Sequence, residues 1–132
     1  FELLGEAARS GDAQAQSRLG TMFAEGWGVE RDEHEAAYWF EQAGERGNLD
    51  GQARLAVLLL DGEQVRPDPL KALDLLRQAA AGGHALAQFH LGLCFLQGRG
   101  VPQDPAQGQN LLRQLARAGL PEATDYLKEH SL

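Results

Sequence analysis

The sequence predicts an all-α fold, a right-handed α–α superhelix of helix–loop–helix repeats with a period of 36 residues. Four glycines follow one another at this interval: Gly11, Gly47, Gly83 and Gly119. Leucines keep the same register: Leu19, Leu55, Leu91 and Leu127. So do aspartates: Asp32, Asp68 and Asp104. A fixed period of this size is typical of a repeat array, in which stacked units share one continuous core and present an extended surface.

The register divides the chain, residues 1–132, into the parts of a single repeat domain. These parts are a partial repeat (1–11), three full repeats (12–47, 48–83 and 84–119) and a C-terminal capping helix (120–132). Lys128 stands where the full repeats have glycine or alanine, which predicts the polar outer face of a capping unit. Leu4 aligns with Phe40, so the chain begins inside a helix, and we expect it to be a fragment of a longer protein.

The first helix of each repeat is predicted from its capping residues. Asp12 and Asn48 are good N-caps, because a short side-chain acceptor satisfies an unpaired backbone N–H. His84 takes this place in the third repeat, and Pro121 fits the first helical position of the last helix. Glycine tolerates the left-handed backbone of a helix end, so the three helices are expected to stop at Gly26, Gly62 and Gly98.

The second helix of each repeat opens on an aspartate N-cap. Proline follows the cap in two repeats and glutamate in the first: Asp32-Glu33, Asp68-Pro69 and Asp104-Pro105. Carboxylates at this end also interact favourably with the helix dipole. These helices are expected to end at Gly47, Gly83 and Gly119.

The best motif lies in the first repeat: Leu19-Gly20, Gly26-Trp27-Gly28-Val29, Asp32, Ala36, Trp39-Phe40, Ala43 and Gly47. It resembles the Sel-one-like repeat (SLR) family, a relative of the tetratricopeptide repeats. The third repeat, with Gly98-Arg99-Gly100-Val101, is nearly as good, whereas the second has Gly62-Glu63-Gln64-Val65 instead. The resemblance implies an all-helical superhelix that acts as an adaptor or scaffold, without naming a partner.

The resemblance also leaves an enzymatic alternative and a range of compartments. Some cysteine-rich relatives are associated with β-lactam binding and hydrolysis, and they look to carry paired cysteines in each repeat. This chain has Cys94 alone, among apolar residues, where inert core packing is expected. Relatives are often exported from bacteria, so the resemblance implies a periplasmic or exported protein and leaves the cytoplasm open.

Composition and residue spacing argue against several functions. The net charge of −7 disfavours binding to a nucleic-acid backbone, and no apolar run approaches the roughly 20 residues of a membrane span. The four histidines have no i, i+4 pair, and no serine lies in G-x-S-x-G. The sequence therefore predicts no catalytic, cofactor-binding or metal-binding residue, and no cofactor.

Charge is distributed unevenly along the chain. Residues 1–68 hold 14 acidic and 6 basic side chains, whereas residues 69–132 hold 5 acidic and 6 basic ones. One interpretation is a solvated acidic face, and the other is a basic partner drawn to the N-terminal half.

Helix 85–97 carries two apolar stripes. The first is the expected core set of Ala87, Leu91 and Phe95. The second lies on the opposite side of the helix: Leu86, Phe89, Leu93 and Leu96. Equivalent positions of the first repeat are mostly polar, so the second stripe either lines a concave groove or packs between repeats.

These patterns predict a non-catalytic protein–protein interaction module that binds a peptide or amphipathic helix in a concave groove, and a basic partner is the one that the acidic half would select. Trp27 is a second candidate contact, because Glu63 and Arg99 occupy its position in the other repeats; a ring folded over its own repeat is the alternative. The candidate partner-binding residues are Trp27, Val57, Leu60, Leu86, Phe89, Leu93 and Leu96. The acidic residues expected to set the register of a basic partner are Glu25, Asp50 and Asp61. The alternatives are a β-lactam-hydrolysing enzyme and self-association through helix 85–97.

Overall fold

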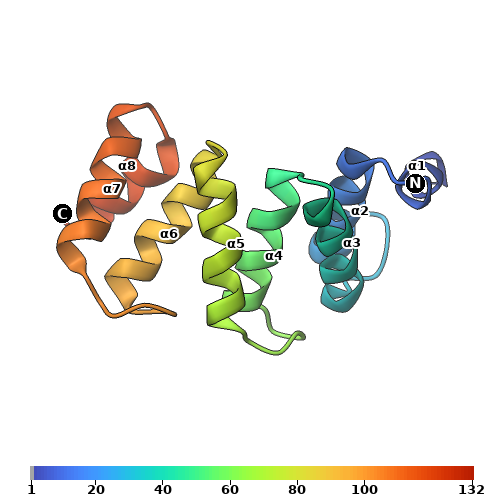
Figure 1. Cartoon of the computed structure of the whole chain (residues 1–132), viewed down its shortest axis with the longest axis horizontal. Helices are drawn as coiled ribbons and strands as arrows, with labels where there is room; N and C mark the ends of the chain where they lie inside the picture. The colour runs from blue at the N-terminus through green and yellow to red at the C-terminus, as the bar shows by residue number, and fades with distance from the viewer. Residues whose placement is uncertain (1) are drawn as a thin grey trace.

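The computed structural model describes residues 2–132, and Phe1 lies outside the described residues. In that range all regular secondary structure is helical, without a strand. Its helices are α1 (Glu2–Arg9), α2 (Ala13–Glu25), α3 (Glu33–Glu45), α4 (Leu49–Asp61), α5 (Pro69–Ala81), α6 (Ala85–Gln97), α7 (Pro105–Arg117) and α8 (Pro121–Glu129). They follow one another along one axis, with the two ends of the chain far apart (Figure 1). The predicted all-α superhelix with 36-residue repeats is confirmed.

The helices begin where the capping residues predict. The Asp12 carboxylate accepts a hydrogen bond from the backbone N–H of Ala15 at 3.0 Å. His84 caps α6 in the same way, its Nδ1 accepting from the N–H of Ala87 at 3.1 Å. The other helices capped by a side chain are those that follow Asp32, Asn48, Asp68 and Asp104. Each cap satisfies a backbone donor that the helix itself leaves unpaired.

The first helices end at the predicted glycines, but with two different backbone conformations. Gly26 and Gly98 are left-handed, with φ of 71° and 69°. Gly62 is extended instead, with φ of −64° and ψ of 148°. The loop after Gly62 has Gln64 where the other loops have a second left-handed glycine, and it is held by Glu33 of the preceding repeat. The loop whose sequence departs from the repeat motif therefore also differs in backbone conformation.

The core is a column of large side chains separated by close helix approaches. Phe40, Leu76 and Leu112 stand 36 residues apart, one in each second helix, and all three are buried. The Phe40 ring lies 2.6 Å from the point where a Cβ on Gly20 would stand. A larger residue at Gly20 would therefore push α2 and α3 apart.

A column of glutamines, absent from the sequence prediction, ties each first helix to the helix before it. The side-chain amides donate to carbonyls eight residues earlier, Gln16 to Ala8, Gln52 to Gly44 and Gln88 to Ala80, at 3.0, 3.1 and 3.2 Å. The three glutamines stand 36 residues apart, so the same bond recurs at each repeat boundary. The signal was present in the sequence as a polar column at the repeat spacing.

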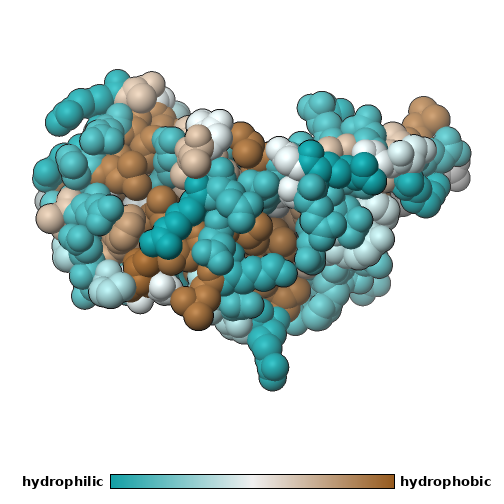
Figure 2. Space-filling view, in the orientation of Figure 1, coloured by the Kyte–Doolittle hydropathy of each residue, from teal (hydrophilic) through white to brown (hydrophobic). Residues whose placement is uncertain are grey.

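The first helices of the repeats lie on the inner side of the superhelix. Helix α2 contacts α4, and α4 contacts α6, whereas the second helices α3, α5 and α7 make no comparable contact with one another in the described chain. The closer spacing of the first helices places α2, α4 and α6 on the concave side, which we call the inner surface. In Figure 2, hydrophobic residues gather over the half of the molecule that holds α5 to α7, while the half with α1 to α3 is mostly hydrophilic.

Candidate interaction surface

The predicted partner-binding residues differ widely in their exposure. The Trp27 side chain, in the loop between α2 and α3, is 59% exposed. Val57 on α4 is half-buried. Leu60 and Phe89 are only 7% and 8% exposed and belong to the core. Trp27 and Val57 are therefore accessible from outside the chain, whereas Leu60 and Phe89 are covered by the residues packed around them.

The second apolar stripe of α6 packs against the next repeat. Phe89 lies in one core cluster with residues of α7 and α8, namely Leu112, Leu115 and Ala123. Its ring meets Tyr126 edge-on, with the ring centroids 6.2 Å apart. The other stripe residues pack on the same cluster and stay half-buried: Leu86, Leu93 and Leu96. At Phe89 the stripe thus serves packing between repeats, and only its flanking leucines reach the surface.

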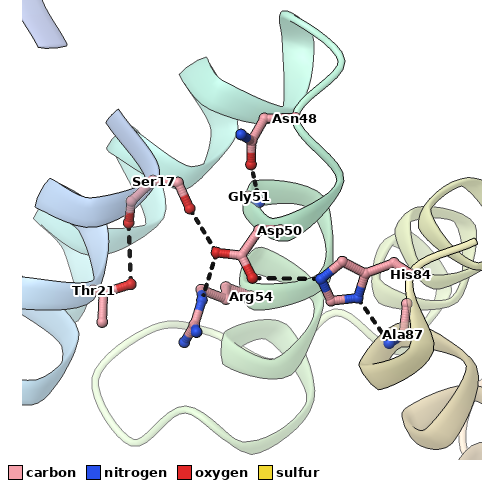
Figure 3. A network of polar contacts seen from close by, with 8 residues as sticks. All are labelled: Ser17, Thr21, Asn48, Asp50, Gly51, Arg54, His84 and Ala87. Atoms are coloured by element: carbon pink, nitrogen blue, oxygen red, sulfur yellow. Dashed lines mark hydrogen bonds and ion pairs between the residues drawn. The ribbon is translucent and has the colours of Figure 1, made fainter. Parts of the chain in front are cut away.

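A polar network joins the three first helices at Asp50 (Figure 3). Its Oδ2 accepts hydrogen bonds from the Ser17 hydroxyl and from Arg54 Nε, both at 2.8 Å. Its Oδ1 lies 3.4 Å from Nε2 of His84, at the start of α6. Because His84 Nδ1 accepts the capping bond, the proton of a neutral ring sits on Nε2 and faces Asp50. One carboxylate therefore holds α2, α4 and α6 in register.

The acidic residues expected to meet a basic partner are mostly occupied within the chain. Burial raises the pKa of Asp50, but the hydrogen bonds from Arg54 and Ser17 and the charge of Arg54 outweigh it and bring the pKa below its usual value. Asp61 accepts a hydrogen bond from Arg99 at 2.7 Å. Of the expected acids, only Glu25 has no cationic partner among the described residues.

Three hollows follow one another along the inner surface. The central hollow, of about 170 Å³, lies between α2, α4 and α6, and its walls include Glu25, Ala53, Arg54, Val57, Leu86 and His90. A shallower hollow of about 400 Å³ lies on the N-terminal side, with walls that include Leu4, Arg18, Met22, Trp27 and Arg54. A third, of about 100 Å³, lies between α4 and α6, with Leu60, Asp61, His90, Leu93 and Arg99. Neighbouring hollows are adjacent and share a wall residue: Arg54 borders the N-terminal and central hollows, and His90 borders the central and third ones.

The central hollow is open because the second repeat has a small residue, Ala53, at a position that makes an interhelical contact in the other repeats. Ser17, Ala53 and Phe89 occupy equivalent positions, 36 residues apart. Ser17 meets Asp50 of the next first helix through a hydrogen bond, and Phe89 meets α8 with a large ring. Ala53 offers only a methyl group, so the space between α4 and α6 stays partly open.

His90 separates the central hollow from the third one. Burial lowers the pKa of this imidazole, and the attraction of Asp61 and Glu122 does not restore the usual value. Near pH 7 the ring is therefore neutral, and it presents a hydrogen-bonding group without charge to both hollows.

Groups suited to catalysis do not gather on this surface. Cys94 is buried, and burial raises the pKa of its thiol, so the reactive thiolate is disfavoured. Within residues 2–132, no three side chains of His, Cys, Asp or Glu are arranged to hold a metal ion. In the same range, no helix has both the length and the apolar character needed to cross a bilayer.

Comparison with solved structures identifies similar repeat proteins. A Sel1 repeat protein from Oxalobacter formigenes is 30% identical, with a TM-score of 0.74, over 96% of this chain and 95% of that one. A Sel1 repeat protein from Klebsiella pneumoniae subsp. pneumoniae is 26% identical, with a TM-score of 0.74, over 92% of this chain and 56% of that one. Cysteine rich protein B from Helicobacter pylori, 21% identical over 94% of both chains with a TM-score of 0.66, shows the fold alone.

The family comparison covers most of the chain. Curated proteins give no match. The Sel1 repeat, however, matches three consecutive segments, residues 13–48, 49–84 and 85–120. Together with the shared superhelix, this match confirms the resemblance seen in the repeat motif: the chain belongs to the Sel1 repeat family.

Proposed function

We propose that this chain is a non-catalytic interaction module whose inner surface binds a peptide or short amphipathic helix of another protein. Sel1 repeat proteins are generally protein-interaction modules and typically non-catalytic scaffolds. The observation that carries the specific proposal is the central hollow between α4 and α6, where Val57 and Leu86 form apolar walls around the gap left by Ala53. One apolar side chain of a partner fits such a hollow.

The energetics favour a small number of apolar anchors. Burying one Leu- or Val-sized side chain contributes about 1.5–3 kcal/mol, and a few such anchors carry most of the binding energy of a typical interface. Val57 and Leu86 would receive one anchor, and the exposed Trp27 ring would receive another. Leu93 and Leu60 would extend the surface into the third hollow, and Leu96 would flank it. Phe89 supports these residues from the core side.

Electrostatics add a long-range preference. The excess of acidic residues in the N-terminal half attracts partners that are basic overall. Glu25, at the edge of the central hollow, has no cationic partner among the residues that the structure describes and offers its carboxylate to one basic side chain. Such steering mainly raises the association rate and weakens with added salt.

The experiment is a selection of displayed 12-residue peptides on the purified chain, followed by affinity measurements on two variants. Val57→Asp places a charge in the central hollow, and Leu70→Asp makes the same change at an exposed leucine of the outer helix α5. The proposal expects Val57→Asp to weaken binding at least tenfold and Leu70→Asp to leave it unchanged. Failure to enrich any peptide, or equal effects of the two variants, contradicts the proposal.

Two further measurements separate the alternatives. Turnover of nitrocefin by the purified chain, above a heat-denatured control, would support a β-lactam-hydrolysing enzyme and count against a scaffold. Light scattering over a hundredfold range of concentration detects self-association through residues 85–97. The interaction proposal expects no turnover, and it expects peptide binding at concentrations where the chain is monomeric.

A further inference from the structure

We propose that the partner segment carries an acidic side chain between two apolar ones, and that the acidic group binds Arg54 and Arg18 on the inner surface. This inference rests on the proposed function and specifies the chemistry of the partner at that site. It differs from the sequence-based expectation, in which acidic residues of this chain would select basic groups.

The first observation is that Arg18 and Arg54 have guanidinium nitrogens without partners among the described residues. Arg18 is exposed on α2 and has no hydrogen-bond or ionic partner among the described residues. Arg54 uses Nε to bind Asp50, and its two terminal nitrogens have no partner in the described chain. Figure 3 shows these nitrogens directed away from the Asp50 carboxylate. Both arginines line the same hollow, so a carboxylate that enters it from outside can pair with them.

The second observation is that the nearby acid does not compete. Asp50 also borders this hollow, but its carboxylate is engaged by Ser17, Arg54 and His84. A basic side chain of a partner would have to displace these contacts before it could pair with Asp50. An incoming carboxylate meets Arg18 and the free edge of Arg54 without displacing any contact.

The third observation places apolar contacts on both sides of this charge. Trp27, Leu4 and Met22 line the same hollow as the arginines. On the other side, Arg54 is also a wall of the central hollow, next to Val57. A bound chain that reaches both hollows passes Arg54 between them. The acidic group is therefore an internal side chain, Asp or Glu, flanked by apolar residues.

The overall charge of this chain restricts the rest of the segment. The N-terminal half carries a large acidic excess, which repels a strongly acidic peptide at long range. A single acidic side chain in an otherwise neutral or basic segment avoids this repulsion and still gains the local arginine contact. The inferred partner thus combines the basic character favoured at long range with one acid at the point of contact.

The test uses an array of end-capped five-residue peptides with Leu, Phe or Met at both ends, Ala beside them, and Glu, Gln or Lys in the centre. Binding to the purified chain is measured by NMR titration. We expect Glu peptides to bind about two- to fivefold more tightly than their Gln partners, as for a partly exposed charged pair, and Lys peptides to bind most weakly. Arg18→Ala, which breaks no hydrogen bond or ion pair among the described residues, is expected to reduce the Glu preference, and Arg54→Ala to abolish it.

The matched control is Arg77→Ala, an exposed arginine on the outer helix α5, which is expected to retain the preference. Circular dichroism verifies the fold of each variant, and Arg18→Ala carries the test if Arg54→Ala unfolds. If Gln or Lys peptides bind best, or if Arg18→Ala and Arg77→Ala behave alike, the inference is overturned while the inner surface remains a peptide site. If no member of the array and no selected peptide binds, the proposed function fails with it.

Discussion

Glu33 and Gln64 exchange hydrogen bonds across a repeat boundary. The Glu33 carboxylate accepts from the backbone N–H of Gln64 at 2.8 Å, and the side-chain oxygen of Gln64 accepts from the backbone N–H of Glu33 at 2.8 Å. Glu33 is only 3% exposed and also pairs with Arg31. The first turn of α3 is thereby fixed to the loop that follows α4.

The same contact is made differently at the next boundary. Pro69 and Gly100 occupy the positions equivalent to Glu33 and Gln64. The Pro69 carbonyl oxygen lies 2.9 Å from the point where a Cβ on Gly100 would stand, so the absence of a side chain allows the loop to approach. Where the second repeat lacks this glycine, a buried carboxylate anchors the loop instead.

Replacing the buried carboxylate is expected to destabilise the fold. Glu33→Ala leaves the N–H of Gln64 without its partner, and a lost bond to a buried charged acceptor costs about 1–3 kcal/mol. Glu35→Ala, on the exposed side of the same helical turn, is expected to stay within about 0.5 kcal/mol of the parent protein. Urea unfolding measures both, and equal stabilities of the two variants would show that the Glu33 bond contributes nothing.

The same group gives the stability a defined pH dependence. Burial raises the pKa of Glu33, but the backbone hydrogen bonds of Gln64 and Val65 and the charge of Arg31 outweigh it, so the folded pKa lies below the usual 4.5. The unfolded chain then binds the proton more readily, and the stabilisation present above pH 4.5 is lost as pH falls through the folded pKa. Glu33→Gln is expected to flatten this acid limb of unfolding free energy against pH. An unchanged limb would contradict the assignment.

The cap at His84 can be tested with a residue that another repeat already uses. Asn48 performs the same role in the second repeat, where its side chain accepts from the N–H of Gly51 at 2.7 Å. His84→Asn is therefore expected to keep α6 capped, whereas His84→Ala loses about 1 kcal/mol. Thermal unfolding of the two variants should differ by a few degrees. If both melt together, the capping bond is not a source of stability.

Substitutions at Phe89 and Val57 are expected to affect different properties: the first mainly lowers stability, and the second mainly weakens peptide binding. Phe89→Ala removes a buried ring from the cluster between α6, α7 and α8 and should cost about 3–5 kcal/mol of unfolding free energy. Val57→Ala, at a half-buried wall of the central hollow, should cost about 1 kcal/mol or less but weaken the selected peptides. Denaturant unfolding and peptide titration check both, and the reverse ranking in either measurement would contradict the placement of these side chains.

The fold could be predicted from the sequence because its determinants are local and repeat. Asp12 and Asp32 predict helix starts because aspartate is a common N-cap, and glycines such as Gly26 predict helix ends. Recurrence every 36 residues then excludes chance. Gly62 shows the limit of this reasoning, because its extended backbone stands in a loop that is bonded to Glu33 of another repeat, a contact that no local pattern predicts.

The candidate site was less predictable because one apolar pattern serves two purposes. A helix inside a superhelix has neighbours on two sides, so the stripe with Phe89 is apolar whether it faces a groove or α8. The sequence also does not show which charged groups are already paired within the chain. Asp50 and Arg54 could be counted from the sequence, but only their mutual pairing shows that the acid is occupied and that the arginine keeps a free edge.

Binding on the inner surface is measured most directly by a backbone amide NMR titration with the tightest peptide from the array. We expect the shift changes to concentrate in α2, α4 and α6, around Arg54 and Val57, and the outer helices α3, α5 and α7 to change little. Changes confined to the outer helices would contradict an inner binding surface, as would the absence of saturable changes anywhere in the chain.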